Sequence, residues 1–279
     1  MFLSIITINR NNAKGLEKTM CSVATQTITG FEYLVIDGAS TDDSFEVIKA
    51  NESKFAHLKW LSEPDTGIYN AMNKGLRMAS GDYIQILNSG DCLASEDVTE
   101  KMIAALEKTG NPSVLYGNMV KCFPDGRRLV DRSFCGNEIT MLGMYLGTLN
   151  HDPVYVRRDL FEKYGYYDES LKIVSDWKWY MQALILGDEK PQYVDLDVTL
   201  FDMTGISEVN LGLRDAEKRK ELEKLIPQPI LADYDNWHFP IEQMERIKRH
   251  PWAYKLVWLL ERALFKFEKK KARKQTGCQ

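Results

Sequence analysis

The chain has 279 residues and a formal net charge of −4, and 44% of its residues are hydrophobic. This composition excludes wholesale disorder and suits one α/β domain of about 200 residues with a C-terminal appendage. Five scattered cysteines form no C-x-x-C pair, which argues against a zinc site or a disulfide framework. The chain has no apolar run of about eighteen residues, and its start has the pattern of a strand rather than a signal peptide. We therefore expect reduced thiols and a cytoplasmic protein.

The N-terminal part alternates between predicted strands and helices. Apolar strands are expected at residues 2–8, 31–37, 58–61 and 83–87, and helices at 13–26, 41–51, 68–79 and 95–108. The clearest helix follows Gly67, where apolar residues recur at helical spacing as far as Ala79. Alternation of this kind predicts an α/β fold with a mostly parallel, twisted sheet flanked by helices.

Beyond Pro112 the pattern changes to a hairpin around the turn at residues 123–126. The elements expected here are strands at 114–122, 128–132, 154–156 and 193–201, with helices at 159–164 and 175–186. Pro227, Pro229 and Pro240 indicate a linker-like segment. We expect one domain at residues 1–205 and a helical extension at residues 206–279.

Polar side chains follow two of the predicted strands. Asp37 ends one strand, and Asn88 and Asp91 follow another. Since open α/β sheets place ligand contacts at the carboxyl ends of strands, we expect a site for a phosphorylated, metal-bound ligand. Asp37 can accept hydrogen bonds from a base or a ribose, and Asn88 and Asp91 can offer oxygen ligands to Mg²⁺ or Mn²⁺. A helix cap for Asp37 and a ligand-free turn at Asp91 are the structural alternatives.

Arg10 follows the first strand, where its guanidinium can hold a phosphate. Thr7 and Asn9 lie beside it in the sequence and are candidates to line the same crevice. The alternative is a solvated surface arginine. The chain contains no P-loop, G-x-G-x-x-G, G-x-S-x-G or H-E-x-x-H string, which weakens kinase, dinucleotide-dehydrogenase, hydrolase and zinc-protease interpretations.

A second candidate cluster lies later in the chain. Asp176 stands near the start of a predicted helix, where it can act as general base for a hydroxyl nucleophile. Trp177 follows it and offers a flat apolar face to a sugar. His151 can meet a phosphate, an acceptor hydroxyl or a metal ion. The alternatives are a helix-capping aspartate, a core tryptophan and a structural histidine.

Five strings of the sequence resemble those of family 2 glycosyltransferases of the GT-A fold. They are SIITINR at 4–10, VIDGASTD at 35–42, EPDTGIYNAMNKG at 63–75, SGDYIQILNSGD at 80–91 and SDW at 175–177. The third is long and specific, and it resembles the branch that builds colanic-acid-like bacterial surface polysaccharides. The resemblance covers about residues 2–205.

The resemblance implies that Asp37 reads the nucleotide base and that Arg10 lies near the base or the phosphates. It also implies a nucleotide-sugar site completed by the residues Thr7, Asn9, Asp65 and Asn88. One departure from the family pattern concerns this site. The usual second acid after the second strand is Gly38 here, which leaves Asp37 alone.

The resemblance further implies that Asp91 binds a divalent cation, Mn²⁺ or Mg²⁺, and that Asp176 deprotonates the acceptor. His151 and Trp177 would lie in the acceptor or sugar pocket. The metal motif has only one acid, Asp91, where the family usually shows more.

The expected function is inverting, metal-dependent transfer of a sugar from a nucleoside-diphosphate donor, with UDP-sugar favoured. The acceptor would be a hydroxyl of a glycan or a lipid-linked molecule in bacterial surface-polysaccharide synthesis. A GT-A relative that binds sugar nucleotides with weak or no turnover is the alternative that the missing acids suggest. A nucleotidyltransferase shares the sheet architecture, but residues 11–15 are a poor version of its Gly-rich basic loop.

The C-terminal end is basic, because residues 245–274 hold eleven Lys or Arg against three Glu. A helix from Pro251 would carry an apolar face made by Trp252, Leu256, Leu259, Leu260, Ala263, Leu264 and Phe267. Such a helix can lie in a membrane interface, so we expect residues 251–274 to contact the inner face of the cytoplasmic membrane. Docking on the catalytic domain is the alternative. The acidic remainder of the chain argues against a nucleic-acid partner.

Overall fold

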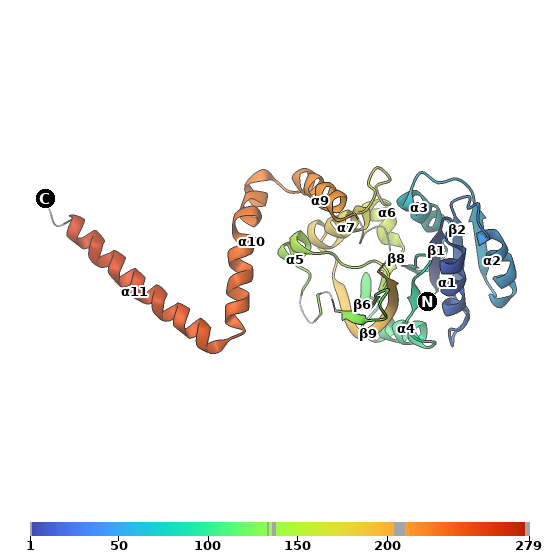
Figure 1. Cartoon of the computed structure of the whole chain (residues 1–279), viewed down its shortest axis with the longest axis horizontal. Helices are drawn as coiled ribbons and strands as arrows, with labels where there is room; N and C mark the ends of the chain where they lie inside the picture. Colours follow the sequence, from blue (N-terminus) through green and yellow to red (C-terminus); the bar gives the residue numbers. More distant parts are fainter. Residues whose placement is uncertain (1, 133, 136–137, 204–209, 277–279) are drawn as a thin grey trace. The chain divides into compact units, whose positions relative to one another are not determined.

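The computed structural model describes residues 2–132, 134–135, 138–203 and 210–276, with side chains as far as residue 269. The chain divides into two compact units, Met1–Glu221 and Leu222–Gln279. The first holds the sheet and its helices, and the second holds the long C-terminal helices (Figure 1). The boundary expected between residues 205 and 206 falls in the segment 204–209, outside the described residues.

The described residues form one nine-stranded sheet in the order β3-β2-β1-β4-β8-β6-β9-β5, with β7 paired to β6. The strands are β1 Leu3–Asn9, β2 Glu32–Asp37, β3 Leu58–Ser62, β4 Tyr83–Ile86, β5 Cys92–Leu93, β6 Val114–Cys122, β7 Arg128–Asp131, β8 Val154–Arg157 and β9 Pro191–Asp202. Strands β3, β2, β1 and β4 are parallel, whereas β8 is antiparallel to both β4 and β6. The predicted α/β fold is confirmed. Its second half is mixed, because β8 is antiparallel to β4 and β6, β7 to β6, and β5 to β9, whereas β6 and β9 are parallel.

The helices of the first unit are α1 Ala13–Ala24, α2 Ser44–Asn51, α3 Ile68–Met78, α4 Val98–Lys108, α5 Met141–Leu146, α6 Asp159–Tyr164 and α7 Ser175–Tyr180. A short 3₁₀ turn, Glu52–Lys54, follows α2, and a π-helical segment, Met181–Leu186, continues α7. Helix α9, Leu211–Leu225, begins in this unit and runs into the second. The helix expected at 175–186 is thus one α-helical and one π-helical piece.

Helices cover both faces of the parallel half of the sheet (Figure 1). On one face, Leu16 of α1 and Ile48 of α2 share a buried cluster with Tyr33 of β2. On the other, α3 approaches so closely that a Cβ at Gly75 would lie 2.5 Å from Cγ2 of Ile6. Both faces are buried, so β1 and β2 are buried at every position and carry apolar residues on both faces rather than on alternate positions.

The second unit holds α10, Gln228–Lys248, and α11, Pro251–Thr276. The linker expected around Pro227–Pro240 is therefore wrong, because this segment is helical. Pro227 caps α10 and Pro229 occupies its first turn, where a missing N–H costs nothing, while Pro240 lies inside the helix. Among the described helices, none combines the length and apolar character needed to cross a bilayer.

Candidate functional site

A cleft with a cavity volume of about 640 Å³ opens beside the carboxyl ends of β1 and β4. Asn9 and Arg10 line it after β1, and Asn88 lines it after β4. His151 and Asp176, from segments far along the chain, complete the same lining. This position matches the rule that ligands of open α/β sheets bind outside the carboxyl ends of the strands.

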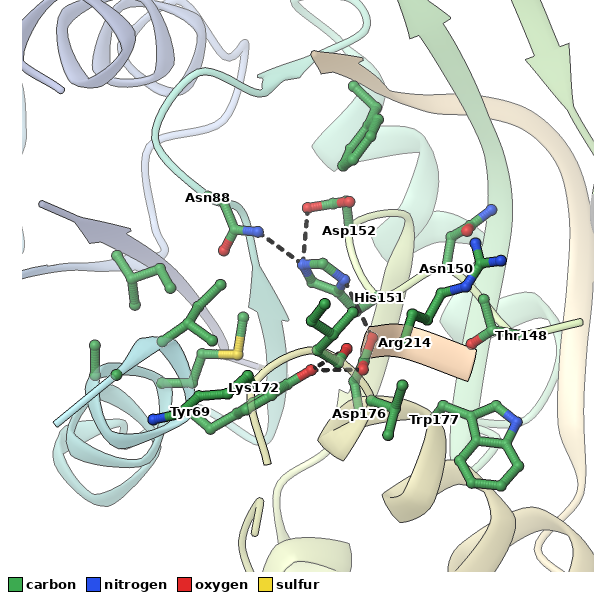
Figure 2. A pocket seen from close by; sticks show the side chains of 18 of the residues that line it. Tyr69, Asn88, Thr148, Asn150, His151, Asp152, Lys172, Asp176, Trp177 and Arg214 are labelled. Carbon is green, nitrogen blue, oxygen red and sulfur yellow. Dashed lines mark hydrogen bonds and ion pairs between the residues drawn. The ribbon is translucent and has the colours of Figure 1, made fainter. Parts of the chain in front are cut away.

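His151 lies at the centre of a polar cluster (Figure 2). Its Nε2 is 3.2 Å from Oδ1 of Asp152 and 2.9 Å from the amide nitrogen of Asn88, and its Nδ1 is 3.4 Å from Oδ2 of Asp176. Burial opposes a charge on His151, but the carboxylates of Asp152, Asp176 and Asp91 outweigh it and raise its pKa to about 9. The cluster therefore holds an imidazolium between two carboxylates at neutral pH. Both ring nitrogens of an imidazolium donate, so the Asn88 amide then presents its oxygen rather than its nitrogen to Nε2.

Asp176 is fixed from two sides. Its Oδ1 lies 2.9 Å from the hydroxyl of Tyr69, which also lies 2.6 Å from the carbonyl oxygen of Ile173. Its Oδ2 faces the His151 ring (Figure 2). The side chain of Asp176 is 15% exposed and lines the cleft, so a carboxylate of set orientation is open to a ligand. A carboxylate held in this way is suited to accept a proton from a bound hydroxyl.

Asp37 is buried at the end of β2, and its carboxylate is saturated by internal hydrogen bonds. It accepts from the amide of Asn9 at 2.9 Å, from the Ser62 hydroxyl at 2.7 Å, and from the hydroxyl and backbone N–H of Ser40 at 2.5 and 2.9 Å. Burial alone would raise the pKa of Asp37, but these hydrogen bonds lower it overall. Asp37 braces the end of β2 and is not part of the cleft lining.

Asp65 takes the space that Gly38 leaves open. A Cβ at Gly38 would collide with the Asp65 carboxylate. That carboxylate accepts the backbone N–H of Gly67 at 3.0 Å and lies 3.3 Å from Nη1 of Arg10. Asp65 and Arg10 both line the cleft. The family that the motifs resemble usually has a second acid after β2, where this chain has Gly38. The Asp65 carboxylate, from the loop before α3, occupies the space beside Gly38.

Two other predicted residues lie outside the lining. Thr7, two residues before the end of β1, is buried and accepts a hydrogen bond from the Tyr33 hydroxyl at 3.0 Å. Asp91 is buried, and its Oδ1 accepts the backbone N–H of Asp202 at 2.8 Å. Burial, reinforced by the charge of Asp152, raises the pKa of Asp91. The structure does not bring either side chain to the cleft.

The residues after β4 do not fit a metal site built by the protein alone. Neutral Asn88 and Ser89 are the ones that face the cleft, and Gly90 follows them. Nowhere in the described chain do three or more His, Cys, Asp or Glu side chains gather as a metal-binding group. With its amide nitrogen towards His151, Asn88 leaves its buried Oδ1 without a hydrogen-bond partner among the described residues, and the buried carboxylate of Asp152, which also lines the cleft, is paired with the His151 ring. One neutral oxygen and one carboxylate that already faces a cation make a weak site for a hard cation. The role of Asp91 as a metal ligand stays a prediction.

Comparison with known proteins assigns the family. The family described as Glycosyl transferase family 2 matches residues 4–165, more than half of the chain. The chain belongs to this family. An uncharacterised glycosyltransferase of Mycobacterium tuberculosis is 33% identical over 209 residues, covering 73% of this chain and 76% of the relative. A PGL/p-HBAD biosynthesis glycosyltransferase of Mycobacterium bovis is 24% identical over 234 residues, covering 80% and 83%.

Solved structures agree on the fold of this family 2 glycosyltransferase. TarS of S. aureus, in complex with UDP-GlcNAc, superposes with a TM-score of 0.67 at 23% identity, covering 86% of this chain and 73% of TarS. The mannosyltransferase PcManGT from Pyrobaculum calidifontis, in complex with GDP-Man and Mn²⁺, gives 0.62 at 18% identity, covering 96% and 82%. The GT-A expectation is confirmed, whereas the surface-polysaccharide branch stays a prediction.

The cleft of this family 2 glycosyltransferase also contains residues that the sequence analysis missed. Among them are Tyr69, Asp152, Lys172, Arg214 and Lys218. Asp152 adjoins His151, and Tyr69 lies in the EPDTGIYNAMNKG string, so proximity to a motif could have singled out both. The cations of α9 lie beyond the matched strings, and their only sequence signal is a basic pair four residues apart. Trp177 is among the lining residues but is buried, with its indole N–H donating to the Met144 carbonyl at 2.8 Å, and its contact with a sugar stays a prediction.

Proposed function

We propose that this glycosyltransferase moves a sugar from a nucleoside-diphosphate donor, with UDP-sugar favoured, to an acceptor hydroxyl with inversion at the anomeric carbon. The observation that supports it is the Asp176 carboxylate, open to the cleft and held between Tyr69 and His151. The acceptor oxygen bonds to the anomeric carbon as the bond to the diphosphate breaks, and its proton passes to Asp176. One displacement of this kind inverts the configuration.

The ligands of the structural neighbours, together with the residues of this cleft, support the proposed donor class. TarS was solved with UDP-GlcNAc and with UDP, and the mannosyltransferase with GDP-Man. In this chain we assign the base contact to Asp65 rather than Asp37. Asp65 lines the cleft, whereas the buried Asp37 carboxylate is saturated by hydrogen bonds within the protein. Arg10, with its side chain 61% exposed, can reach a base or a phosphate. The acceptor is proposed to be a glycan or a lipid-linked molecule of the bacterial surface.

We also propose that a divalent cation binds together with the donor, with few ligands from the protein. The mannosyltransferase neighbour holds Mn²⁺. In this chain the cleft-facing Asn88 and Ser89 are neutral, and Asp91 turns its carboxylate to the backbone of Asp202. An ion would therefore depend mainly on the donor phosphates for its ligands. No step of the proposed reaction passes through such an ion.

The test is a binding and turnover panel with UDP-, GDP- and dTDP-sugars, each with Mn²⁺ and with EDTA. Asp176→Asn should lower donor hydrolysis or transfer by about 10²- to 10⁴-fold, the usual contribution of a general base, and leave nucleotide affinity unchanged. Asp65→Ala should instead weaken nucleotide binding. Asp188→Asn is the control, because Asp188 is an exposed loop residue at a positive φ that Asn also adopts. Wild-type turnover by Asp176→Asn would refute the assignment.

The alternative is a protein that binds sugar nucleotides with weak or no turnover. The observation that favours it is the loss of acids at two places, Gly38 after β2 and Asn88 after β4. The same panel separates the two functions. Nucleotide-dependent stabilisation without hydrolysis or transfer of any donor would support the binding protein over the enzyme.

A membrane contact is proposed for the second unit. Helix α11 exposes large apolar side chains, among them Trp252 at 73% and Phe267 at 68%. Lys255, Arg262 and Lys266 lie on the same helix. The side chains of the basic residues at 270–274 lie outside the described part of the structure. Exposed rings with nearby cations suit an anionic lipid surface. Helix α10 adds Trp237 and Phe239, each 60% exposed, which the sequence analysis did not single out.

A further inference from the structure

Three cationic side chains line the cleft from two segments of the first unit. Lys172 lies in the loop before α7, and Arg214 and Lys218 lie one turn apart on α9. Glu217 joins the two segments, because its carboxylate accepts the backbone N–H groups of Lys172 at 2.8 Å and Ile173 at 2.9 Å. The fold therefore holds all three cations beside one cavity.

These cations are poorly neutralised by the protein. Lys218 is partly buried; its ammonium donates to the carbonyl of Gly147 at 2.8 Å and lies 5.2 Å from the centroid of the Trp177 ring. Burial, reinforced by the charge of Arg214, lowers the pKa of Lys218 to about 8. Within the described ranges, no salt bridge joins Lys172 or Lys218 to a carboxylate, and Arg214 pairs with its neighbour Asp215. The four aspartates of the same lining are paired with Arg10, Arg214 and His151, so the charges of Lys172 and Lys218 remain to favour an anionic ligand.

The residues after β4 that line the cleft carry no charge, although a metal-binding carboxylate would be expected there. Asn88 and Ser89 face the cleft without charge, and the Asp91 carboxylate is buried against the backbone of Asp202. The cleft-facing segment after β4 thus offers only neutral oxygens to an ion, and the Asp152 carboxylate, which lines the cleft nearby, faces the His151 cation. The cationic side chains remain available to a diphosphate.

We propose that Lys172, Arg214 and Lys218 bind the diphosphate of the donor and neutralise the leaving group in place of a metal ion held by the protein. This inference rests on the proposed function. A guanidinium can hold two phosphate oxygens at once, and ammonium groups act as point charges beside them. As the bond to the sugar breaks, charge grows on the departing diphosphate, and cations already in place stabilise it without reorganisation. Asp176 takes the acceptor proton in the same cleft.

Calorimetric titration of UDP, GDP, inorganic pyrophosphate and uridine, each with EDTA and with Mn²⁺, tests the inference. We expect the preferred diphosphate to bind in EDTA. Lys172→Met, Arg214→Gln and Lys218→Met should each weaken it by about tenfold to a hundredfold, the effect of losing a charged hydrogen bond. Affinity for uridine should not change. Lys220→Met, an exposed lysine on the same helix and outside the cleft, is the matched control and should bind as wild type. Melting temperatures of all variants check folding.

The outcomes separate this inference from the proposed function. If the wild type binds UDP or GDP only with Mn²⁺, or if the three variants bind as tightly as Lys220→Met, the cationic site is refuted while the proposed function stands. If neither nucleotide binds but pyrophosphate does, and the variants lose it, the cationic site holds and the proposed function fails. If no phosphate compound binds under either condition, both are overturned.

Discussion

His151 should stabilise the fold as a cation at pH values where an ordinary histidine is neutral. Its ring is 18% exposed and lies between Asp152 and Asp176, and its pKa is raised to about 9 despite burial. Because the folded pKa exceeds the ordinary value of about 6.5, the stabilisation is complete below pH of about 6.5 and is lost as the pH rises through about 9. A shift of about 2.5 units corresponds to about 3 kcal/mol of free energy of unfolding.

The perturbation is His151→Gln, which keeps a hydrogen-bonding side chain and removes the charge. Urea unfolding at several pH values between 6 and 9.5 should show the variant less stable by about 3 kcal/mol at the acid end, with the gap closing towards pH 9.5. Groups outside the cluster that titrate in this range, such as Lys218, are present in both proteins and cancel. Within the cluster, the variant also loses the charge that lowers the pKa of Asp152 and Asp91. His57→Gln, at an exposed position, is the control. A gap between wild type and His151→Gln that stays constant across the range would refute the reasoning.

Two further predictions concern the fold and the second unit. Gly75→Ala should destabilise the protein by about 1–3 kcal/mol in urea unfolding, because the new Cβ would lie 2.5 Å from Cγ2 of Ile6 in a packed core. Gly212→Ala is the control: it has open space around it and should be neutral or stabilising. Equal effects of the two substitutions would contradict the packing argument. Trp252→Glu with Phe267→Glu in the full chain should abolish co-sedimentation with phosphatidylglycerol vesicles, and undiminished binding, or equal binding to phosphatidylcholine, would contradict the membrane contact.

Elements of regular structure were well predicted from local pattern. The helix predicted at 68–79 is α3, Ile68–Met78, and the hairpin predicted around residues 123–126 is β6–β7. Apolar spacing and turn residues act over a few neighbours, so they can be read from the chain directly. The segment Pro227–Pro240 shows where prediction from local pattern fails. The prolines suggested a linker, but Pro229 lies in the first turn of α10, where proline is compatible with a helix.

The candidate site was predicted less completely. The motifs indicated the strand ends, and Asn9, Arg10, Asp65 and Asn88 do line the cleft. A sequence places a carboxylate after a strand, but it does not say which backbone or hydroxyl donors will take up its oxygens. Asp91, bound by the backbone of Asp202, is such a case.

The sequence by itself determined the α/β alternation, the apolar strands buried on both faces, and the family to which the motifs belong. Only the tertiary structure decided that Tyr69 meets Asp176, which lies 107 residues away in the chain, and that His151 becomes a cation between two carboxylates. It also decided that α9 brings Lys218 into the cleft. The physical reason is that propensity and periodicity depend on neighbours along the chain. The charge state and partners of a buried group depend instead on segments that only packing brings together.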